Sequence, residues 1–331
     1  MNMQDKKSNV QKALNKLKIH DECCRLCPRE CGVNRKKGDR GYCRTGIQAI
    51  LSHALIHPGE EPILSGFDDC RRQGLRGCTS GSGTVFFTGC HLKCSFCQNY
   101  QLSWENQGKP VTDEELAGTM LDLQQRGALN INLVSPTHLI VPVLRALEIA
   151  YEKGLHIPLV YNSNGYERTE TLHNLEGVVD IYLPDFKYAS SRIAQKYSGV
   201  NDYFFYTSSA VKEMVRQRPA LIVDKEEIAR EGVIIRHLVL PGQIEDSLAV
   251  LDWIGKNLDT GIGFSLMSQY QPCFRAPAEL RRRLTPGEYA RVRDHAEKLN
   301  IEMLFLQPYL MKAGESLVPD FEKESPFNWP R

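Results

Sequence analysis

The sequence predicts an α/β protein, a complete or partial TIM-type (β/α) barrel preceded by a small cysteine-rich N-terminal region. Two observations lead to this fold class. From Thr84 onward, short apolar runs alternate with longer amphipathic stretches, as expected for βα units around a parallel sheet. These 248 residues hold six or seven such repeats, and no Gly-rich dinucleotide fingerprint follows the first run, which disfavours a doubly wound open sheet.

Individual elements follow from the apolar pattern. The expected strands are the short runs 84–88, 131–135, 158–162, 179–183, 233–240, 263–267 and 302–306. The expected helices between them are 112–126, 139–153, 209–218, 245–257 and 285–299. Thr112 and Thr285 each stand three residues before a glutamate, which predicts a capping box at the start of both helices.

Residues 1–83 differ from the rest in composition and apolar pattern, and they are predicted as a separate unit before the barrel of residues 84–331. A short helix is expected around Val10, Leu14 and Leu17, which have helical spacing. Residues 20–83 are rich in Cys, Gly and Arg and poor in periodic apolar pattern, so a metal site rather than an apolar core is expected to hold them.

Composition excludes several classes of protein. Charged residues make up 24% and hydrophobic residues 42%, unlike a disordered or coiled-coil chain. Lys plus Arg number 41 and Asp plus Glu 40, so no charge excess favours nucleic acid or an acidic membrane as partner. The first twenty residues are too polar for a signal peptide, and no apolar run is long enough to span a bilayer. We expect a soluble, cytoplasmic protein.

Cysteine is the most informative residue type. Of 11 cysteines, ten lie between Cys23 and Cys97, and only Cys273 lies beyond them. Their number is odd and the cytosol keeps thiols reduced, so disulfides are disfavoured. Clustered thiols in an intracellular chain indicate metal binding.

Three of these cysteines follow the first barrel strand directly. Cys90, Cys94 and Cys97 fall within eight residues, with aromatic Phe96 before the last. Three thiolates at the mouth of a barrel suit an iron–sulfur cluster, and three ligands for four irons leave one iron open for a substrate or cofactor. A catalytic zinc with three protein ligands and an open position is the alternative.

This motif resembles the signature of the radical S-adenosylmethionine (radical SAM) superfamily. The resemblance implies a radical SAM barrel whose [4Fe–4S] cluster binds SAM through its open iron. One electron then cleaves SAM, and the 5′-deoxyadenosyl radical abstracts hydrogen from a substrate. An electron donor such as a flavodoxin or ferredoxin is implied as partner. More narrowly, the chain resembles the PflX-type relatives of the pyruvate formate-lyase-activating enzyme in the segments Glu60-Glu-Pro, Leu64-Ser-Gly, Gly81-Ser-Gly, Cys97-Gln-Asn, Ser135-Pro-Thr-His, Tyr161-Asn-Ser-Asn-Gly-Tyr, Asp180-Ile-Tyr-Leu-Pro-Asp-Phe-Lys-Tyr and Arg236-His-Leu-Val-Leu-Pro-Gly.

The resemblance also implies residues that bind SAM. Polar side chains at successive strand ends are expected to do so, as is the aromatic residue of the motif: Phe96, Asn162, Asn164, Asp185, Lys187 and Arg236. A guanidinium can pair with the methionine carboxylate through two hydrogen bonds. The usual Gly-Gly-Glu after the second strand is absent, and Ser135-Pro-Thr-His138 stands there instead. Ser135 and His138 are therefore candidate SAM or substrate contacts. Strand-end polar residues also cap helices or form simple salt bridges.

A second group of cysteines lies near the N-terminus. Its four candidate ligands, Cys24, Cys27, Cys31 and Cys43, suffice for a tetrahedral zinc or for a second [4Fe–4S] cluster. An iron–sulfur cluster there could relay electrons or bind substrate, whereas zinc would stabilise the fold.

Other reactive residues carry weaker signals. Cys70 and Cys78 lie in an apparent insertion and either extend the metal site or stand in a solvent-side loop. The group His53, His57, Glu60 and Glu61 is interpreted as loop packing or a docking surface. Cys273 follows a late strand and is either a structural thiol or a hydrogen donor to a substrate radical.

The leading hypothesis is a radical SAM enzyme acting on an unidentified protein, peptide or small molecule. A glycyl-radical-enzyme activase is the first alternative, although activases with extra clusters carry their additional cysteines after the motif rather than before it. A non-catalytic iron–sulfur electron carrier or redox sensor is the second alternative. It is disfavoured because a carrier needs no cavity lined by polar strand ends.

Overall fold

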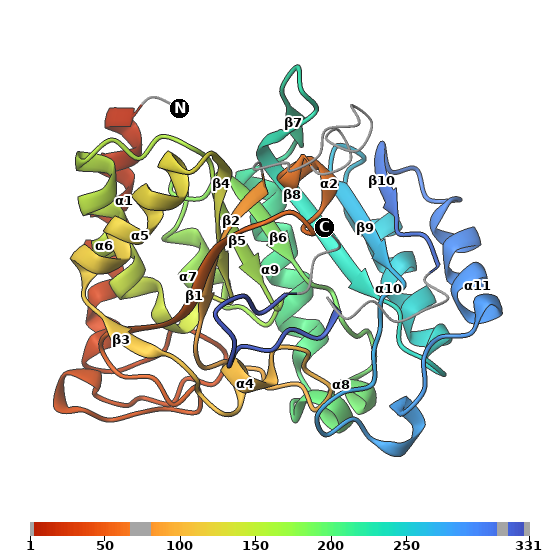
Figure 1. Ribbon diagram of the computed structural model, residues 1–331. Coiled ribbons are helices and arrows are strands. Elements are labelled where there is room, and N and C mark those ends of the chain that lie inside the picture. The colour runs from red at the N-terminus through yellow and green to blue at the C-terminus, as the bar shows by residue number, and fades with distance from the viewer. Residues whose placement is uncertain (1–2, 67–80, 310–316, 328–331) are drawn as a thin grey trace.

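The computed structural model describes residues 3–66, 81–309 and 317–327, and its centre is one twisted sheet (Figure 1). The strand order is β10-β9-β8-β6-β5-β4-β2-β1-β3, with β7 (Ile222–Val223) paired to β8 alone. The parallel strands are β2 (Gly81–Phe87), β4 (Ala128–Val134), β5 (Leu159–Ser163), β6 (Ile181–Pro184), β8 (Ala229–Leu238), β9 (Gly263–Met267) and β10 (Met303–Leu306). Within the described ranges β10 pairs only with β9, so the barrel is a partial one. The predicted fold class is confirmed.

Helices follow most of the parallel strands and cover the outside of the sheet (Figure 1). They are α5 (Asp113–Gln125), α6 (Ile140–Glu152), α7 (Thr169–His173), α8 (Ser191–Ser198), α9 (Tyr203–Gln217), α10 (Ile244–Asn257) and α11 (Pro286–Ala296). Every strand and helix predicted for the barrel is present. Both capping boxes form, Thr112 with Glu115 and Thr285 with Glu288. None of the described helices is both long and apolar enough to cross a membrane.

Helix α9 begins six residues before the predicted start at 209. Its first turn is aromatic, and Tyr203 is completely buried, stacking on Tyr166 and contacting Tyr188 edge-on. Asp202 precedes the helix without a side-chain capping bond. Tertiary packing therefore sets this helix start, which a local sequence pattern does not reveal.

Residues 3–66 pack against the barrel and add one strand to its sheet. Helix α1 (Met3–Leu17) packs against α6, and strand β1 (Ala49–His57) runs antiparallel to β2. The short strand β3 (Lys109–Val111) pairs with the far side of β1, and α2 (Pro62–Ser65) follows β1. Strand β1 was not predicted, because only Ala49 is fully buried and the strand shows no alternating burial. The proposed division between 1–83 and 84–331 stays a prediction.

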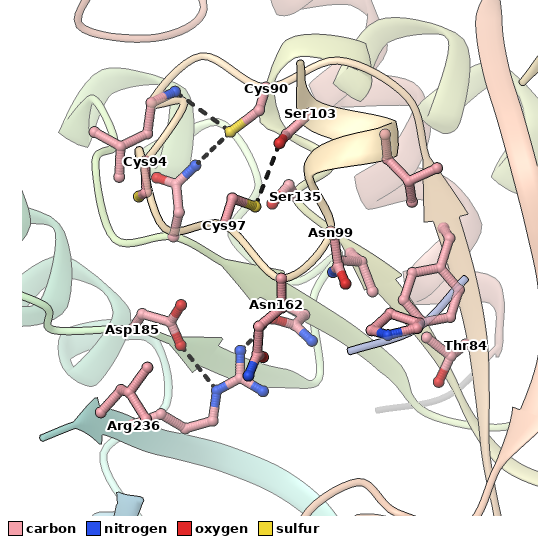
Figure 2. A pocket seen from close by; sticks show the side chains of 18 of the residues that line it. Thr84, Cys90, Cys94, Cys97, Asn99, Ser103, Ser135, Asn162, Asp185 and Arg236 are labelled. Carbon is pink, nitrogen blue, oxygen red and sulfur yellow. Dashed lines mark hydrogen bonds and ion pairs between the residues drawn. The ribbon is translucent and has the colours of Figure 1, made fainter. Parts of the chain in front are cut away.

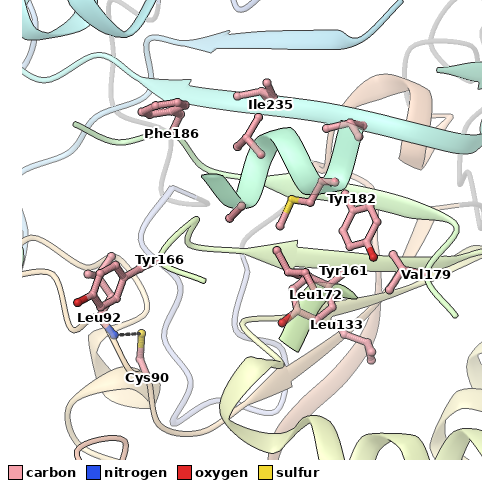
Figure 3. Packing of buried hydrophobic residues seen from close by; sticks show 14 of the residues in the cluster. Cys90, Leu92, Leu133, Tyr161, Tyr166, Leu172, Val179, Tyr182, Phe186 and Ile235 are labelled. Atoms are coloured by element: carbon pink, nitrogen blue, oxygen red, sulfur yellow. Dashed lines mark hydrogen bonds between the residues drawn. The ribbon is translucent and has the colours of Figure 1, made fainter. Parts of the chain in front are cut away.

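The core lies between the sheet and its helices. Tyr161 of β5, Tyr182 of β6 and Ile235 of β8 point toward this outer layer (Figure 3), and the Tyr182 hydroxyl donates to Gln217 of α9 at 2.6 Å. Because strand side chains alternate between faces, the neighbours Asn162 and Arg236 point into the barrel. Burying each large apolar side chain contributes roughly 1.5–3 kcal/mol. The same alternation that builds the core therefore lines the interior with polar groups.

A buried ion pair joins α1 to the barrel and gives a first prediction. Lys6 Nζ lies 2.5 Å from Asp180 Oδ2, and both side chains are 9% exposed. Lys6→Met leaves a buried carboxylate without its cation, so we expect a loss of about 3–5 kcal/mol in unfolding free energy. Urea unfolding measures it. The control is Lys12→Met on the exposed face of α1, and equal effects of the two changes would contradict the prediction.

Candidate active site

A cavity of about 300 Å³ opens at the carboxyl ends of the parallel strands. Ten of the residues predicted as ligands or SAM contacts line it: Cys90, Cys94, Phe96, Cys97, Ser135, Asn162, Asn164, Asp185, Lys187 and Arg236. They come from β2, β4, β5, β6 and β8, or from the loops that follow these strands. Figure 2 shows the three cysteines on one side of the cavity and the Asp185–Arg236 pair on the other.

The cysteine loop connects β2 to the short helix α4 (Tyr100–Ser103). All three sulfurs accept hydrogen bonds from neutral donors. Asn164 Nδ2 donates to Cys90 at 3.6 Å, and two serine hydroxyls donate to the others, Ser198 to Cys94 at 3.2 Å and Ser103 to Cys97 at 3.3 Å. Such donors stabilise negative charge on sulfur and tune a bound cluster.

Burial favours the protonated form of two of these thiols, Cys90 and Cys97, unless a metal replaces the proton. Burial raises the pKa of Cys90 and raises that of Cys97 to about 12. A metal ligand must be a thiolate, so positive charge at the site would favour ionisation. Among the described residues, no three His, Cys, Asp or Glu side chains converge around a point that could hold a single metal ion. The donor set fits an iron–sulfur cluster, whose irons each take a separate cysteine.

An ionic network occupies the side of the cavity opposite the cysteines. The Arg236 guanidinium donates from Nε to Asp185 at 2.9 Å, from one terminal nitrogen to Glu60 at 3.2 Å and from the other to Asn162 at 2.7 Å. Lys187 Nζ donates to the second oxygen of Asp185 at 2.6 Å. All three guanidinium nitrogens are thus engaged by protein groups, and a ligand carboxylate would have to share or replace one of these partners.

The charges in this network are mutually stabilising. Burial alone would raise the pKa of Asp185, but Arg236 and Lys187 lower it below its ordinary value. Burial likewise opposes the charged form of Lys187, yet Asp185 beside it raises its pKa. Asp185 is therefore an anion and Lys187 a cation at neutral pH.

Glu60 and Glu61 belong to this interior rather than to a docking surface. Glu60 lines the cavity and accepts from Asn132 Nδ2 at 2.8 Å, and Glu61 accepts from Ser265 Oγ at 3.0 Å. Burial raises the pKa of Glu61 to about 7. Both precede α2, whose first residue is Pro62, and the segment between β1 and α2 carries them into the barrel. The only sequence signal was the Glu60-Glu-Pro segment itself.

Ser135 and His138, the replacements for the missing Gly-Gly-Glu, lie in different places. Ser135 lines the cavity and has a positive φ of 52°, an uncommon conformation for a residue with a side chain. His138 is 1% exposed and does not line the cavity. Its Nε2 donates to the Thr88 carbonyl at 2.9 Å, and burial lowers its pKa to about 3, so the ring is neutral. Contact of His138 with SAM stays a prediction.

Asn164 and Cys273 have defined structural contacts. Asn164 Oδ1 accepts from the Tyr166 backbone at 3.0 Å, while its amide donates to Cys90. Cys273 donates to the Phe96 carbonyl at 3.3 Å, and burial raises its pKa to about 11. It supports the cysteine loop and does not line the cavity.

The N-terminal cysteines form a second group outside the cavity. Cys24, Cys27 and Cys43 are buried, and Cys31 is exposed. The four are near enough to interact electrostatically, Cys24 with Cys31 and with Cys43, and Cys27 with Cys24 and Cys43. Four thiols suit a four-cysteine site by their chemistry, but here too no three side chains of the described residues surround a position for a single metal ion. Cys70 and Cys78 lie outside the described residues.

The segment 317–327 covers part of the cavity wall. Leu317, Pro319 and Phe327 line the cavity, and the rings of Phe321 and Phe327 lie 5.2 and 5.7 Å from that of Phe86. The segment runs beside β1 and α4 (Figure 1, dark blue). His53 and His57 were predicted as loop packing or a docking surface, but both lie on strand β1 and touch this segment. His53 Nε2 donates to the Lys323 carbonyl at 3.0 Å, and the His57 ring meets Phe327 edge-on at 4.6 Å.

A buried glutamate next to the cavity, Glu167, gives a prediction about the pH dependence of stability. Glu167 is 0% exposed and accepts from Thr137 at 2.6 Å and from the cavity residue Ser163 at 2.5 Å. Burial raises its pKa to about 7, although these hydroxyls act in the opposite direction. Because the pKa is raised on folding, protonated Glu167 stabilises the folded state. This stabilisation is fully present below about pH 4.5 and is lost as the pH rises through about 7.

Glu167→Gln removes this titration. From pH 5 to pH 8, the unfolding free energy of the wild type should fall relative to the variant by about 2–3 kcal/mol. Urea unfolding of both proteins at each pH measures the difference, in which other titrating groups cancel. A difference that stays constant over this range would show that Glu167 does not titrate there.

Comparisons with known proteins agree with the chemistry of the donor set. The family model described as "Radical SAM superfamily" matches residues 84–254. "Uncharacterized protein MJ0674" of Methanocaldococcus jannaschii is 32% identical over 294 residues, which cover 85% of this chain and 76% of that protein.

Solved structures that match part of the chain include two with bound S-adenosylmethionine. Streptococcus suis SuiB bound to S-adenosylmethionine has a TM-score of 0.45 and 13% identity, covering 66% of this chain and 48% of that one. The protein anSMEcpe with bound AdoMet has a TM-score of 0.46 and 14% identity, covering 66% and 58%. The chain thus spans about half the length of the solved proteins that it matches.

Proposed function

Because the chain belongs to the radical SAM superfamily, we propose that it is an enzyme that holds a [4Fe–4S] cluster on Cys90, Cys94 and Cys97 and binds SAM beside it. When bound, this cofactor pair supplies reductive cleavage of SAM and hydrogen abstraction from a substrate. The observation that carries the proposal is the cavity in which three cysteine sulfurs, each accepting a hydrogen bond, face a polar wall.

The residues of the chain have distinct tasks in this proposal. Ser103, Ser198 and Asn164 orient the sulfurs and stabilise their negative charge. The ionic network around Arg236 offers charged and hydrogen-bonding groups to the amino and carboxylate ends of a methionine moiety. The Gln98 amide nitrogen is buried at the cavity without a partner among the described residues, so a bound ligand would satisfy it.

The substrate is proposed as a protein, peptide or small molecule that reaches the cavity past the segment 317–327. Activation of a glycyl-radical enzyme is one form of this reaction. The nine described cysteines are all free thiols, which supports a reducing compartment such as the cytoplasm. A one-electron donor of the flavodoxin or ferredoxin class is proposed as partner.

Anaerobic reconstitution tests the proposed function. With dithionite and SAM, the wild type should form 5′-deoxyadenosine, and SAM should perturb the EPR signal of the reduced cluster. The triple change Cys90/Cys94/Cys97→Ala should lose about four irons per chain and all of the product. Cys273→Ala serves as the matched control, because this thiol supports the same loop from outside the cavity.

One outcome would favour a different function. An intact, reducible cluster whose EPR signal is unaffected by SAM, with no deoxyadenosine formed, would indicate an electron carrier or redox sensor instead of an enzyme.

A further inference from the structure

We propose that the N-terminal group of Cys24, Cys27, Cys31 and Cys43 holds a second iron–sulfur cluster that receives electrons at the protein surface and passes them to the cluster on Cys90, Cys94 and Cys97. The inference rests on the proposed function. It differs from a structural zinc site in requiring a route between the two cysteine groups and a surface on which an electron donor can dock.

The two groups are in direct backbone contact. Gly89 immediately precedes Cys90 and has φ +85°, and a Cβ atom there would lie 2.5 Å from the Cys43 carbonyl oxygen and 2.8 Å from Thr45 Cγ2. Arg29, two residues after Cys27, donates to the His91 carbonyl at 3.0 Å. The N-terminal group is therefore packed against the loop that carries the first cluster, with no intervening element.

Two buried cations lie between the groups and need an anion. Arg35 is 3% exposed, donates to the His138 carbonyl at 2.5 Å and to Cys43 Sγ at 3.7 Å, and has its Nε without a partner. Lys93 is 5% exposed, and its ammonium lies 5.0 Å from the Tyr42 ring. Neither forms an ion pair with a carboxylate in the part of the chain that the structure describes. Thiolates and clusters on both sides would compensate these charges.

Lys93 interacts with both groups. Lys93 directly precedes Cys94, and its ammonium is near enough to both Cys90 and Cys43 to interact with them electrostatically. A positive charge shared by two clusters makes the addition of an electron to either one easier. A zinc ion, which has no redox chemistry, would give this shared cation no role in electron transfer.

The N-terminal group reaches the surface, whereas Cys90 and Cys94 are buried. Cys31 is exposed, and the surrounding segment 23–44 carries seven Lys or Arg and two Asp or Glu. Five of its basic side chains are exposed: Arg25, Lys36, Lys37, Arg40 and Arg44. This basic surface fits an acidic one-electron carrier protein, because complementary charge accelerates association.

The proposed transfer is balanced. The donor protein loses one electron and the N-terminal cluster gains it. The N-terminal cluster then returns to its oxidised state as the first cluster is reduced. No bond is formed or broken, and no proton moves.

The first test is the metal content of the Cys90/Cys94/Cys97→Ala variant, which keeps the N-terminal group. We expect about four irons per chain, no zinc, and an EPR signal after reduction with dithionite. Lys93→Met should lower the reduction potential of this cluster, and Lys93→Arg should restore it. One zinc and no iron would overturn the inference, as would loss of all metal. In either case, deoxyadenosine formation by the wild type would leave the proposed function standing.

The second test addresses docking and does not depend on folding of cysteine variants. Lys36→Glu/Lys37→Glu reverses exposed charges on the basic surface, and Lys256→Glu on α10 is the control. With a reduced flavodoxin as donor at low salt, cluster reduction in the double variant should slow by about tenfold or more. With dithionite, deoxyadenosine formation should be unchanged. Equal rates for wild type and double variant with flavodoxin would contradict electron delivery at this surface.

Discussion

Arg236→Met is expected to abolish deoxyadenosine formation and to destabilise the fold by about 3–5 kcal/mol. The side chain is the hub of the cavity wall, with Asp185, Glu60 and Asn162 each bonded to a different guanidinium nitrogen. Methionine fills much of the volume but leaves Glu60 without a cation and Asp185 with Lys187 alone. The variant then buries two carboxylates, and only Asp185 keeps a cation. The unpaired charge disfavours folding, and it also repels a negatively charged group of a ligand.

The measurement combines urea unfolding with the SAM-dependent change in the EPR signal. Arg236→Lys keeps the charge but cannot form three directed hydrogen bonds, so partial stability with weak SAM binding is expected. Arg230→Met on the same strand is the control. Its exposed pair with Asp224 should contribute about 0–1 kcal/mol. Normal SAM cleavage by Arg236→Met would show that Arg236 does not contribute to SAM binding or cleavage.

Gly89→Ala is expected to disrupt both cysteine groups at once. The positive φ alone costs about 1–2 kcal/mol for a residue with a side chain. The added methyl group would also approach the Cys43 carbonyl at 2.5 Å, Thr45 at 2.8 Å and His138 Nε2 at 3.1 Å. Such overpacking costs roughly 1–3 kcal/mol or more, because backbone atoms cannot rotate away.

Gly199→Ala separates these two contributions. Gly199 also has a positive φ, +64°, but nothing lies within 4 Å of a Cβ atom there. Urea unfolding of the two variants should differ by the steric part alone. Iron counted per chain should fall in Gly89→Ala and stay at the wild-type value in Gly199→Ala. Full iron content in Gly89→Ala would show that the contact with Cys43 tolerates displacement.

The sequence predicted the barrel well because strands buried on both faces produce short continuous apolar runs. Strand β9 matches the predicted residues 263–267, and the capping boxes at Thr112 and Thr285 depend only on local spacing. The cysteine motif was visible for the same reason. Its three ligands are close in sequence, so no knowledge of the fold was needed to bring them together.

The rest of the site depends on tertiary contacts that leave no local pattern. Ser103 and Ser198 donate to motif sulfurs from two different helices, and Glu60 enters the barrel from the segment after β1. His138 was predicted as a SAM or substrate contact because it stands where the usual Gly-Gly-Glu is missing. The 3₁₀ turn at Thr137–Leu139 places its ring against the Thr88 carbonyl, a contact that the sequence does not reveal.

The contact of Phe86 with Phe321 and Phe327 has a consequence for protein engineering. The segment that matches the superfamily ends at residue 254, yet the walls of its cavity come from Glu60 before it and from Met267, Leu317 and Phe327 after it. A transplanted unit that keeps this cavity must therefore include the chain from Glu60 to Phe327, not the matched segment alone. Truncation before Leu317 would remove part of the cavity wall, whereas helix α1 packs against α6 and does not line the cavity.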